Sequence, residues 1–150
     1  MSETFEIFRK NIQTAFEPGK QLCIDETLFC FRGRCAHRQY MPAKPAKYGL
    51  KYNCIVDVKT SYLLDCRPYL GMINNVRDTD CGRKIVMKLC KEYYGTHRNV
   101  TMDNFFTSIP LAEDMFNENL SLIGTLRANK VKLIKLIKHI ASMYSISEKF

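Results

Sequence analysis

Two aspartates at the ends of short apolar runs are the residues of this sequence whose type and spacing suggest chemistry. Asp25 closes the run Leu22–Ile24, and Asp103 closes the run Val100–Met102. Neither run has the three-to-four-residue spacing of an amphipathic helix, so each is interpreted as a short buried strand that ends in a carboxylate. A buried charge costs free energy unless it is paired or binds a metal. Two such carboxylates, far apart in the sequence, predict a shared divalent-metal site on one sheet.

Carboxylate oxygens suit a hard cation such as Mg²⁺, and Mn²⁺ is the second candidate. Two such ions about 4 Å apart can activate a nucleophile and stabilise the leaving oxygen when a phosphodiester is cut or joined. This interpretation requires that the strands ending in Asp25 and Asp103 lie side by side. The alternative is that both aspartates are ordinary turn residues, which often follow strands.

A basic segment separates these two aspartates. Between Thr27 and Val56 there is no acidic residue, and three tyrosines lie among the positive charges. Lys and Arg side chains bind phosphates while tyrosines stack on bases, and the formal charge of +8 also favours a polyanionic partner. The alternative is a solvated loop on an inert basic surface. The predicted nucleic-acid-binding residues are Arg32, Arg34, Arg38, Lys44, Lys47, Tyr48 and Lys51.

Strands and helices alternate in a way that predicts an α/β fold with a mixed sheet. The segments 51–58 and 62–70 are joined by a short turn and are expected to pair as an antiparallel hairpin. Ser108 and Pro110 are expected to begin a helix as its N-cap and first turn, and Gly95 to end one. The predicted strands are 21–25, 51–58, 62–70, 99–103 and 120–126, and the predicted helices are 2–16, 78–94, 108–117 and 131–144.

Length and composition indicate one globular domain in a reducing compartment. The chain has 150 residues, of which 46% are hydrophobic and 25% charged. Its seven cysteines are odd in number and form no CxxC pair, which favours free thiols over disulfides or a zinc ribbon. A metal site from Cys30, Cys35 and His37 is the alternative. No apolar stretch approaches the roughly 20 residues of a membrane span, and no secretory leader is recognisable, so we expect a soluble intracellular protein.

Several motifs resemble the piggyBac-type DDE/D transposases. The resemblance extends in order from about Phe16 to Lys130, whereas residues 131–150 diverge from the family pattern. The segments that carry it are Phe16–Gly19, Leu22–Glu26, Phe31–Cys35, Tyr40–Gly49, Pro68–Gly71, Asn99–Ala112 and Leu122–Lys130.

The resemblance implies an RNase H-like catalytic core whose first and second catalytic aspartates are Asp25 and Asp103. It further implies nuclear, metal-dependent cleavage and joining of DNA at transposon ends, with insertion at TTAA targets. DNA is then the partner, a homodimer on the DNA ends is an added expectation, and neither a small-molecule substrate nor a membrane is involved.

The chain departs from the family at the third catalytic aspartate. From Asn119 onward the only acidic residue is Glu148, close to the end of the sequence and after a dissimilar helix. We therefore expect a single partial catalytic domain over residues 1–150, C-terminally incomplete, with weak metal binding and little or no turnover. Two alternatives are a domesticated nucleic-acid-binding module without catalysis and a decayed product without a settled function.

Overall fold

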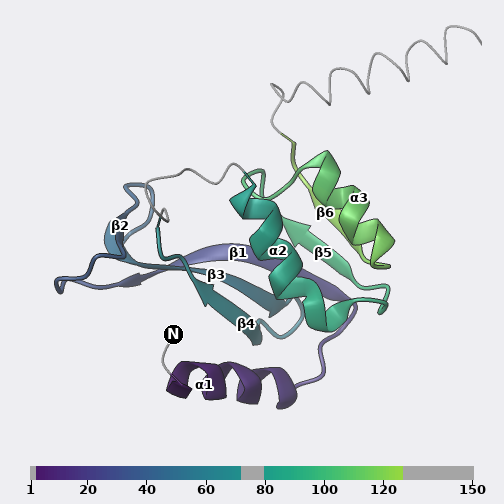
Figure 1. Cartoon of the computed structure of the whole chain (residues 1–150), viewed down its shortest axis with the longest axis horizontal. Helices are drawn as coiled ribbons and strands as arrows, with labels where there is room; N and C mark the ends of the chain where they lie inside the picture. Colours follow the sequence, from purple (N-terminus) through teal and green to yellow (C-terminus); the bar gives the residue numbers. More distant parts are fainter. Residues whose placement is uncertain (1–2, 72–79, 127–150) are drawn as a thin grey trace, which may run out of the picture.

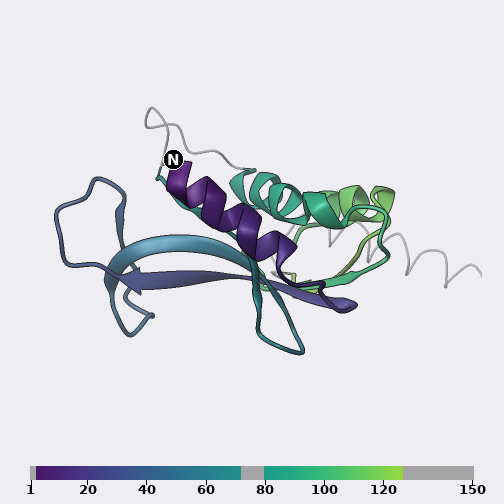
Figure 2. The ribbon, with the colours of Figure 1, turned by 90° about the horizontal axis from the view of Figure 1, so that it is seen from below.

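Three helices lie on one side of a mixed sheet in the computed structural model, which describes residues 3–71 and 80–126 (Figures 1 and 2). The helices are α1 (Glu3–Thr14), α2 (Cys81–Cys90) and α3 (Ile109–Asn117). The strands are β1 (Gln21–Cys30), β2 (Arg38–Tyr40), β3 (Tyr48–Asp57), β4 (Leu63–Pro68), β5 (Asn99–Met102) and β6 (Ser121–Gly124).

The sheet is mixed because β3 runs against its neighbours. The main path is β2-β3-β1-β5-β6, and β4 also pairs with β3. β3 is antiparallel to β1, β2 and β4, whereas β5 is parallel to β1 and β6 is parallel to β5. The predicted α/β class and the predicted β3–β4 hairpin are therefore confirmed.

The core lies between the helices and one face of the sheet. Leu22 and Ile24 alternate along β1 with more exposed residues, and both have no exposed surface. They belong to one apolar cluster with Leu89 of α2 and with Leu111 and Met115 of α3. Period-two burial is the pattern of a strand with one face against a core. The first half of β1 is thus fixed by packing as well as by backbone pairing.

α1 is attached to the edge strand β4 by a buried ion pair. The Arg9 guanidinium donates from Nε to Asp65 Oδ1 at 2.6 Å and from Nη2 to Asp65 Oδ2 at 2.7 Å. The two residues are only 5% and 1% exposed. Fork-to-fork pairing of this kind fixes orientation as well as distance, so Asp65 orients α1 against the sheet.

The first strand is longer than the sequence predicts. β1 was expected to end at Asp25, but it continues to Cys30, and its partner β3 begins at Tyr48 rather than at residue 51. Backbone pairing to β3 extends from Leu22 opposite Asp57 to Cys30 opposite Gly49. At Gly49 a Cβ would overlap the Phe29 carbonyl, so the two strands approach closely there. Because most side chains of this extension are exposed, they leave no alternating pattern to predict it from.

One helix end follows the predicted capping chemistry, whereas α2 ends before Gly95. The Ser108 hydroxyl accepts a hydrogen bond from the Leu111 amide at 3.3 Å, which confirms the N-cap of α3. α2 ends at Cys90 rather than Tyr94, since a 3-10 turn over Lys91–Tyr93 follows it before Gly95 at φ +75°. No described helix is long and apolar enough to cross a membrane. The predicted helix over 131–144, Glu148, and the beginnings of the helices predicted at 2 and 78 lie outside the described residues.

Candidate functional site

The two aspartates occupy corresponding positions on neighbouring parallel strands. The β1–β5 register pairs Ile24 with Met102. Asp25 directly follows Ile24, and Asp103 directly follows Met102. Neighbouring strands lie about 4.8 Å apart. Asp25 therefore lies within β1 rather than at its end, whereas Asp103 directly follows β5, and both side chains are exposed. The condition that the two strands lie side by side is met.

Each carboxylate uses one oxygen for a nearby backbone amide. Asp25 Oδ1 accepts a hydrogen bond from the Glu26 amide at 2.7 Å. Asp103 Oδ1 accepts from the Phe105 amide at 2.9 Å and from the Phe106 amide at 3.4 Å. Within the described part of the chain, the second oxygen of each carboxylate makes no hydrogen bond. One oxygen of each side chain thus orients it, and the other is open to a ligand.

The surroundings of Asp25 disfavour the thiolate form of the nearby cysteines. All seven cysteines are free. Burial, and then the negative charge of Asp25, raise the pKa of the Cys23 thiol. Burial likewise raises the pKa of the Cys54 thiol, which lies opposite Asp25 on β3. Since the thiolate is the form that binds metals, the donors offered here are hard carboxylate oxygens.

The donor set fits a divalent ion only in part. Asp25 and Asp103 provide oxygens suited to Mg²⁺ or Mn²⁺. Glu26, the nearest additional carboxylate in sequence, lies 3.4 Å from the Lys44 ammonium through its Oε1. Among residues 3–71 and 80–126, no three His, Cys, Asp or Glu side chains form a group that could hold a metal. Within the described residues, Asp25 and Asp103 are thus two carboxylates on adjacent strands that no third candidate ligand accompanies.

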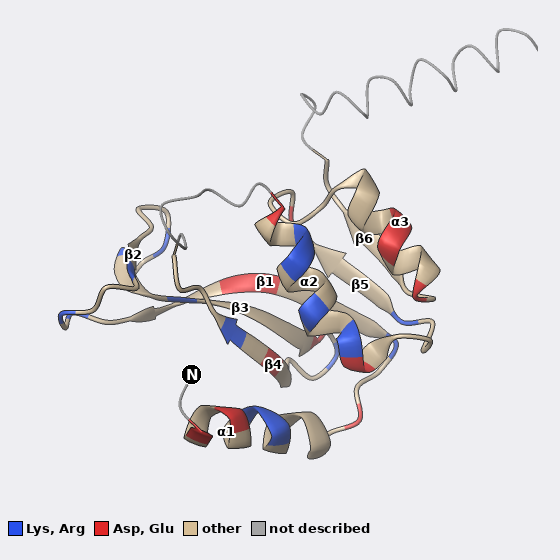
Figure 3. Ribbon diagram, in the orientation of Figure 1, with Lys and Arg blue, Asp and Glu red and all other residues tan. Residues whose placement is uncertain are grey.

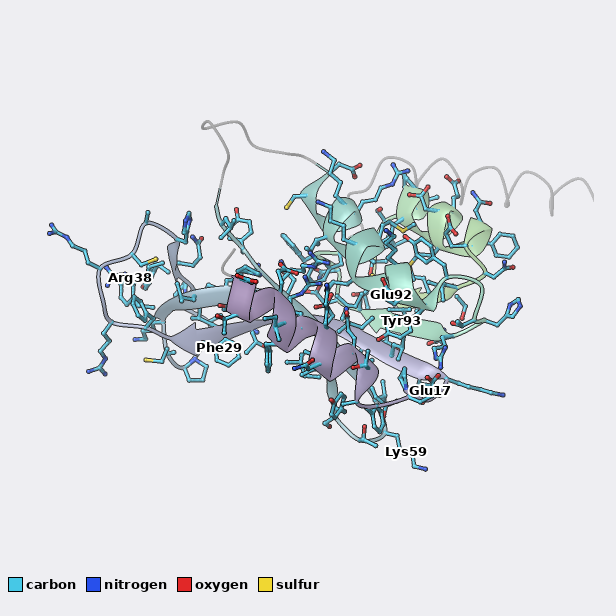
Figure 4. The ribbon with its side chains drawn as sticks, turned by 60° about the horizontal axis from the view of Figure 1, so that its bottom comes forward. Glu17, Phe29, Arg38, Lys59, Glu92 and Tyr93 are labelled. Atoms are coloured by element: carbon cyan, nitrogen blue, oxygen red, sulfur yellow. The ribbon has the colours of Figure 1, made fainter. Side chains whose placement is uncertain are left out.

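The predicted DNA-binding residues lie on a projecting part of the sheet. The outer ends of β1 and β3, with β2, extend away from the helices and carry blue but no red segments (Figure 3). Arg38 lies at this end, far from Glu17 and Lys59 (Figure 4). We call residues 27–52 the basic hairpin. Arg32, Arg34 and Lys47 are exposed there and form no ion pair with a carboxylate of the described residues.

Arg38, Tyr40 and Tyr48 form a small exposed cluster on the basic hairpin. The Arg38 guanidinium lies 5.3 Å from the centre of the Tyr48 ring, and the Tyr40 and Tyr48 ring centres are 4.7 Å apart. Arg38 Nη1 also lies 3.4 Å from the carbonyl oxygens of Arg32 and Gly33. Tyr40 and Tyr48 are about half exposed. The cluster presents a positive charge beside two half-exposed aromatic side chains.

Lys44 and Lys51, like Arg38, have side-chain partners within the protein. Lys44 Nζ donates to the Glu26 carbonyl at 3.1 Å in addition to its ion pair with the Glu26 side chain. Lys51 Nζ lies 4.7 Å from the Phe105 ring centre and 5.6 Å from the Tyr69 ring centre. Charge alone did not distinguish them from the exposed arginines. Their partners Glu26 and Phe105 each lie within two residues of a predicted catalytic aspartate. This proximity was the sequence signal that could have indicated a structural role for the two lysines.

Comparison with known proteins gives one family and consistent relatives. The family model described as Transposase IS4 matches residues 1–141. The human PiggyBac transposable element-derived protein 3 is 25% identical over 122 residues, which are 78% of this chain and 20% of that protein. The human Chimeric ERCC6-PGBD3 protein has the same identity over 122 residues, which are 11% of its length.

A solved structure extends the similarity to three dimensions. The cryo-EM structure of a piggyBac transposase synaptic complex with hairpin DNA matches 89% of this chain at 40% identity, with a TM-score of 0.80. The match covers 28% of that transposase chain. This chain therefore spans about a tenth to under a third of the length of these relatives. The predicted RNase H-like fold, a mixed sheet with flanking helices, is confirmed.

Proposed function

Because the chain belongs to the Transposase IS4 family and has a piggyBac-like transposase core, we propose that Asp25 and Asp103 are two metal-binding carboxylates of a DNA strand-cleavage and strand-transfer site. The observation that carries the proposal is the β1–β5 register, which brings both aspartates to the same level on adjacent strands. DDE transposases as a class use divalent metal ions. The ion bound here is proposed to be Mg²⁺ or Mn²⁺.

The chain's own residues would act by positioning. A divalent ion at this site supplies positive charge that stabilises the negative charge developing at phosphorus. Asp25 and Asp103 would hold such an ion with their carboxylates, which the Glu26 and Phe105 amides already orient. Strand pairing fixes the two backbones relative to each other, so little reorganisation is needed when the ion binds. Two ligands give weak binding, and full activity would need further ligands.

Metal binding is tested with Mn²⁺ alone on the full chain, followed by electron paramagnetic resonance. Wild type is expected to bind weakly, and the Asp25→Asn and Asp103→Asn variants to lose most of this binding. Asp80→Asn is the matched control, because Asp80 is an exposed aspartate at the beginning of α2. Equal binding by all four proteins would overturn the assignment of the metal ligands.

DNA binding is proposed for the basic hairpin, supported by the exposed Arg32 and Arg34 and by the charge of +8. Each phosphate contact contributes about 0.9 to the slope of log affinity against log salt on duplex DNA. Replacing Arg32 and Arg34 by alanine is therefore expected to lower that slope by about 2, whereas Lys59→Ala at the far end of the sheet leaves it unchanged. An unchanged slope in the arginine variant would place DNA elsewhere.

A second candidate is a nucleic-acid-binding module without catalysis. It is favoured by one observation, the lack of a third metal ligand near the aspartates among the described residues. The two candidate functions predict different effects of the Asp25→Ala and Asp103→Ala substitutions on DNA binding and DNA nicking. The module keeps its DNA affinity in these variants, with or without Mg²⁺. The metal site instead predicts that any Mg²⁺-dependent nicking of DNA by the wild type, which is expected to be slight, disappears in them.

A further inference from the structure

Lys51 joins three segments around the turn that follows β5. Its backbone pairs with Leu28 of β1, and its carbonyl accepts a hydrogen bond from the Tyr69 amide at 2.8 Å. Its ammonium group lies 5.6 Å from the Tyr69 ring centre and 4.7 Å from the Phe105 ring centre. A cation within about 6 Å of a ring face is attracted to it. The half-buried Lys51 side chain therefore holds Phe105 against the sheet.

The turn that contains Phe105 also orients Asp103. The amides of Phe105 and Phe106 both donate to Asp103 Oδ1. Phe106 is 2% exposed and belongs to the core, so this side of the turn is fixed by packing. Phe105 is 50% exposed and has its ring edge-to-face with Phe106 at 5.0 Å. Lys51 therefore adds a contact from β3 to the outer half of the turn.

We propose that Lys51 is a positioning residue for Asp103: its ammonium group, held between Tyr69 and Phe105, fixes the turn that orients the Asp103 carboxylate toward the metal. This inference rests on the proposed function, in which Asp103 is a metal ligand. It also assigns Lys51 a role different from phosphate binding, in contrast to the exposed Arg32 and Arg34 on the same hairpin.

Hydrogen exchange of the full chain, followed by nuclear magnetic resonance, tests this role without metal or DNA. Lys51→Met keeps the aliphatic stem but removes the charge, and it is expected to speed exchange at the Phe105 and Phe106 amides about two- to fivefold. Lys51→Arg keeps a cation for the rings and is expected to restore slow exchange. Lys59→Met, an exposed lysine on the β3–β4 turn, is the matched control and leaves both amides unchanged.

Three outcomes would overturn the inference. They are unchanged exchange in Lys51→Met, equally fast exchange in Lys51→Arg, and acceleration that extends to Val100 and the rest of β5, which would indicate general destabilisation. DNA affinity gives an independent readout. A positioning role leaves the salt slope unchanged in Lys51→Met, whereas a fall of about 0.9 would identify a phosphate contact and contradict the inference.

The proposed function fails by a separate observation. If Mn²⁺ binding is the same in wild type and in Asp25→Asn or Asp103→Asn, the metal assignment is wrong. The exchange rates at Phe105 and Phe106 still decide whether Lys51 holds the turn. Conversely, normal exchange in Lys51→Met together with Mn²⁺ binding lost in Asp103→Asn rejects the positioning role and retains the metal site.

Discussion

The inner and outer halves of the β1–β3 pair differ in side-chain burial, although the same two strands form both halves. In the inner half, Ile24 and Ile55 face each other across the ladder and have no exposed surface. In the outer half, Phe29 and Tyr48 are 54% and 47% exposed. The inner half is covered by helices, whereas the basic hairpin projects beyond them (Figure 1). Stability is thus concentrated in one half, and the charges available to a polyanion in the other.

Asp25 and Asp103 lie where these two halves meet. Each directly follows a buried core residue, Ile24 or Met102, and each is exposed. The packed half therefore fixes the carboxylates, and the positive charges lie on β2, on the outer half of β3 and on the loops between β1, β2 and β3. A site that binds a charged polymer needs side chains held by a rigid scaffold and a surface that the polymer can reach. The following predictions test whether stability and binding separate in this way.

The largest loss of stability is expected from the buried ion pair of the inner half. Asp65→Ala leaves the buried Arg9 guanidinium with the 42% exposed Glu6 carboxylate as its remaining ion-pair partner among the described residues, and should lower the free energy of unfolding by up to about 3–5 kcal/mol. Asp114→Ala removes a similar pair with Arg83 that is 28–36% exposed, so it should cost less than about 1 kcal/mol. Urea unfolding measures both. Equal losses would mean that burial does not determine how much each ion pair contributes to stability. A noncooperative unfolding transition of wild type would favour the interpretation as a decayed product.

A matched pair of truncations on β1 compares its halves directly. Ile24→Ala creates a cavity in the core and should lower the free energy of unfolding by about 2–5 kcal/mol. Phe29→Ala removes a larger side chain, but one that is half exposed, and should cost about 1 kcal/mol or less. Chemical denaturation of both variants gives the two losses of unfolding free energy and hence their ratio. A Phe29 variant as unstable as the Ile24 variant would show that the hairpin is part of the folding core.

The sequence predicted the inner half well because burial leaves a pattern. Leu22 and Ile24 lie in a short apolar run, Ser108 has the chemistry of an N-cap, and the β3–β4 hairpin follows from two apolar segments with a short turn. Each of these signals is local. The adjacency of β1 and β5 was a requirement of the chemistry rather than a pattern, and the structure meets it.

The outer half was missed because its pairing is not local and its side chains are exposed. Residues 26–30 pair with residues 49–53 through backbone hydrogen bonds, which depend little on side-chain type. Likewise, the number of positive charges does not tell which have partners. Lys44 pairs with Glu26, and Lys51 lies between two rings, while Arg32 remains exposed. Only the folded geometry separates structural cations from available ones.

Acid sensitivity should also originate in the inner half. The Asp57 carboxylate accepts hydrogen bonds from the Thr60 hydroxyl and amide and from the Gly19 amide, and these bonds lower its pKa. A lowered pKa in the folded state contributes stability above the unfolded value of about 4, and this contribution is lost as the pH falls through the folded pKa. Urea midpoints should therefore fall below about pH 4 in wild type.

Asp57→Asn separates this contribution from that of other acids. The variant is less stable at neutral pH, and its midpoint should change less than that of wild type between about pH 4 and pH 2. Thr60→Ala removes the hydroxyl donor, so the pKa of Asp57 in the folded state should rise. The loss of stability on acidification should then occur at a higher pH than in wild type. Parallel pH profiles of wild type and Asp57→Asn would mean that another carboxylate controls acid unfolding.

The smallest effect on stability is expected from the charges of the basic hairpin, although their effect on binding is large. Arg32→Ala with Arg34→Ala removes two exposed side chains, and each exposed substitution typically changes stability by less than about 0.5 kcal/mol. The same double variant is predicted to lose a salt slope of about 2 in DNA binding. Its urea midpoint and its DNA affinity should therefore change independently. If the midpoint falls as far as it does in Ile24→Ala, the arginines stabilise the hairpin, and the two halves of β1 and β3 fold and bind as one unit.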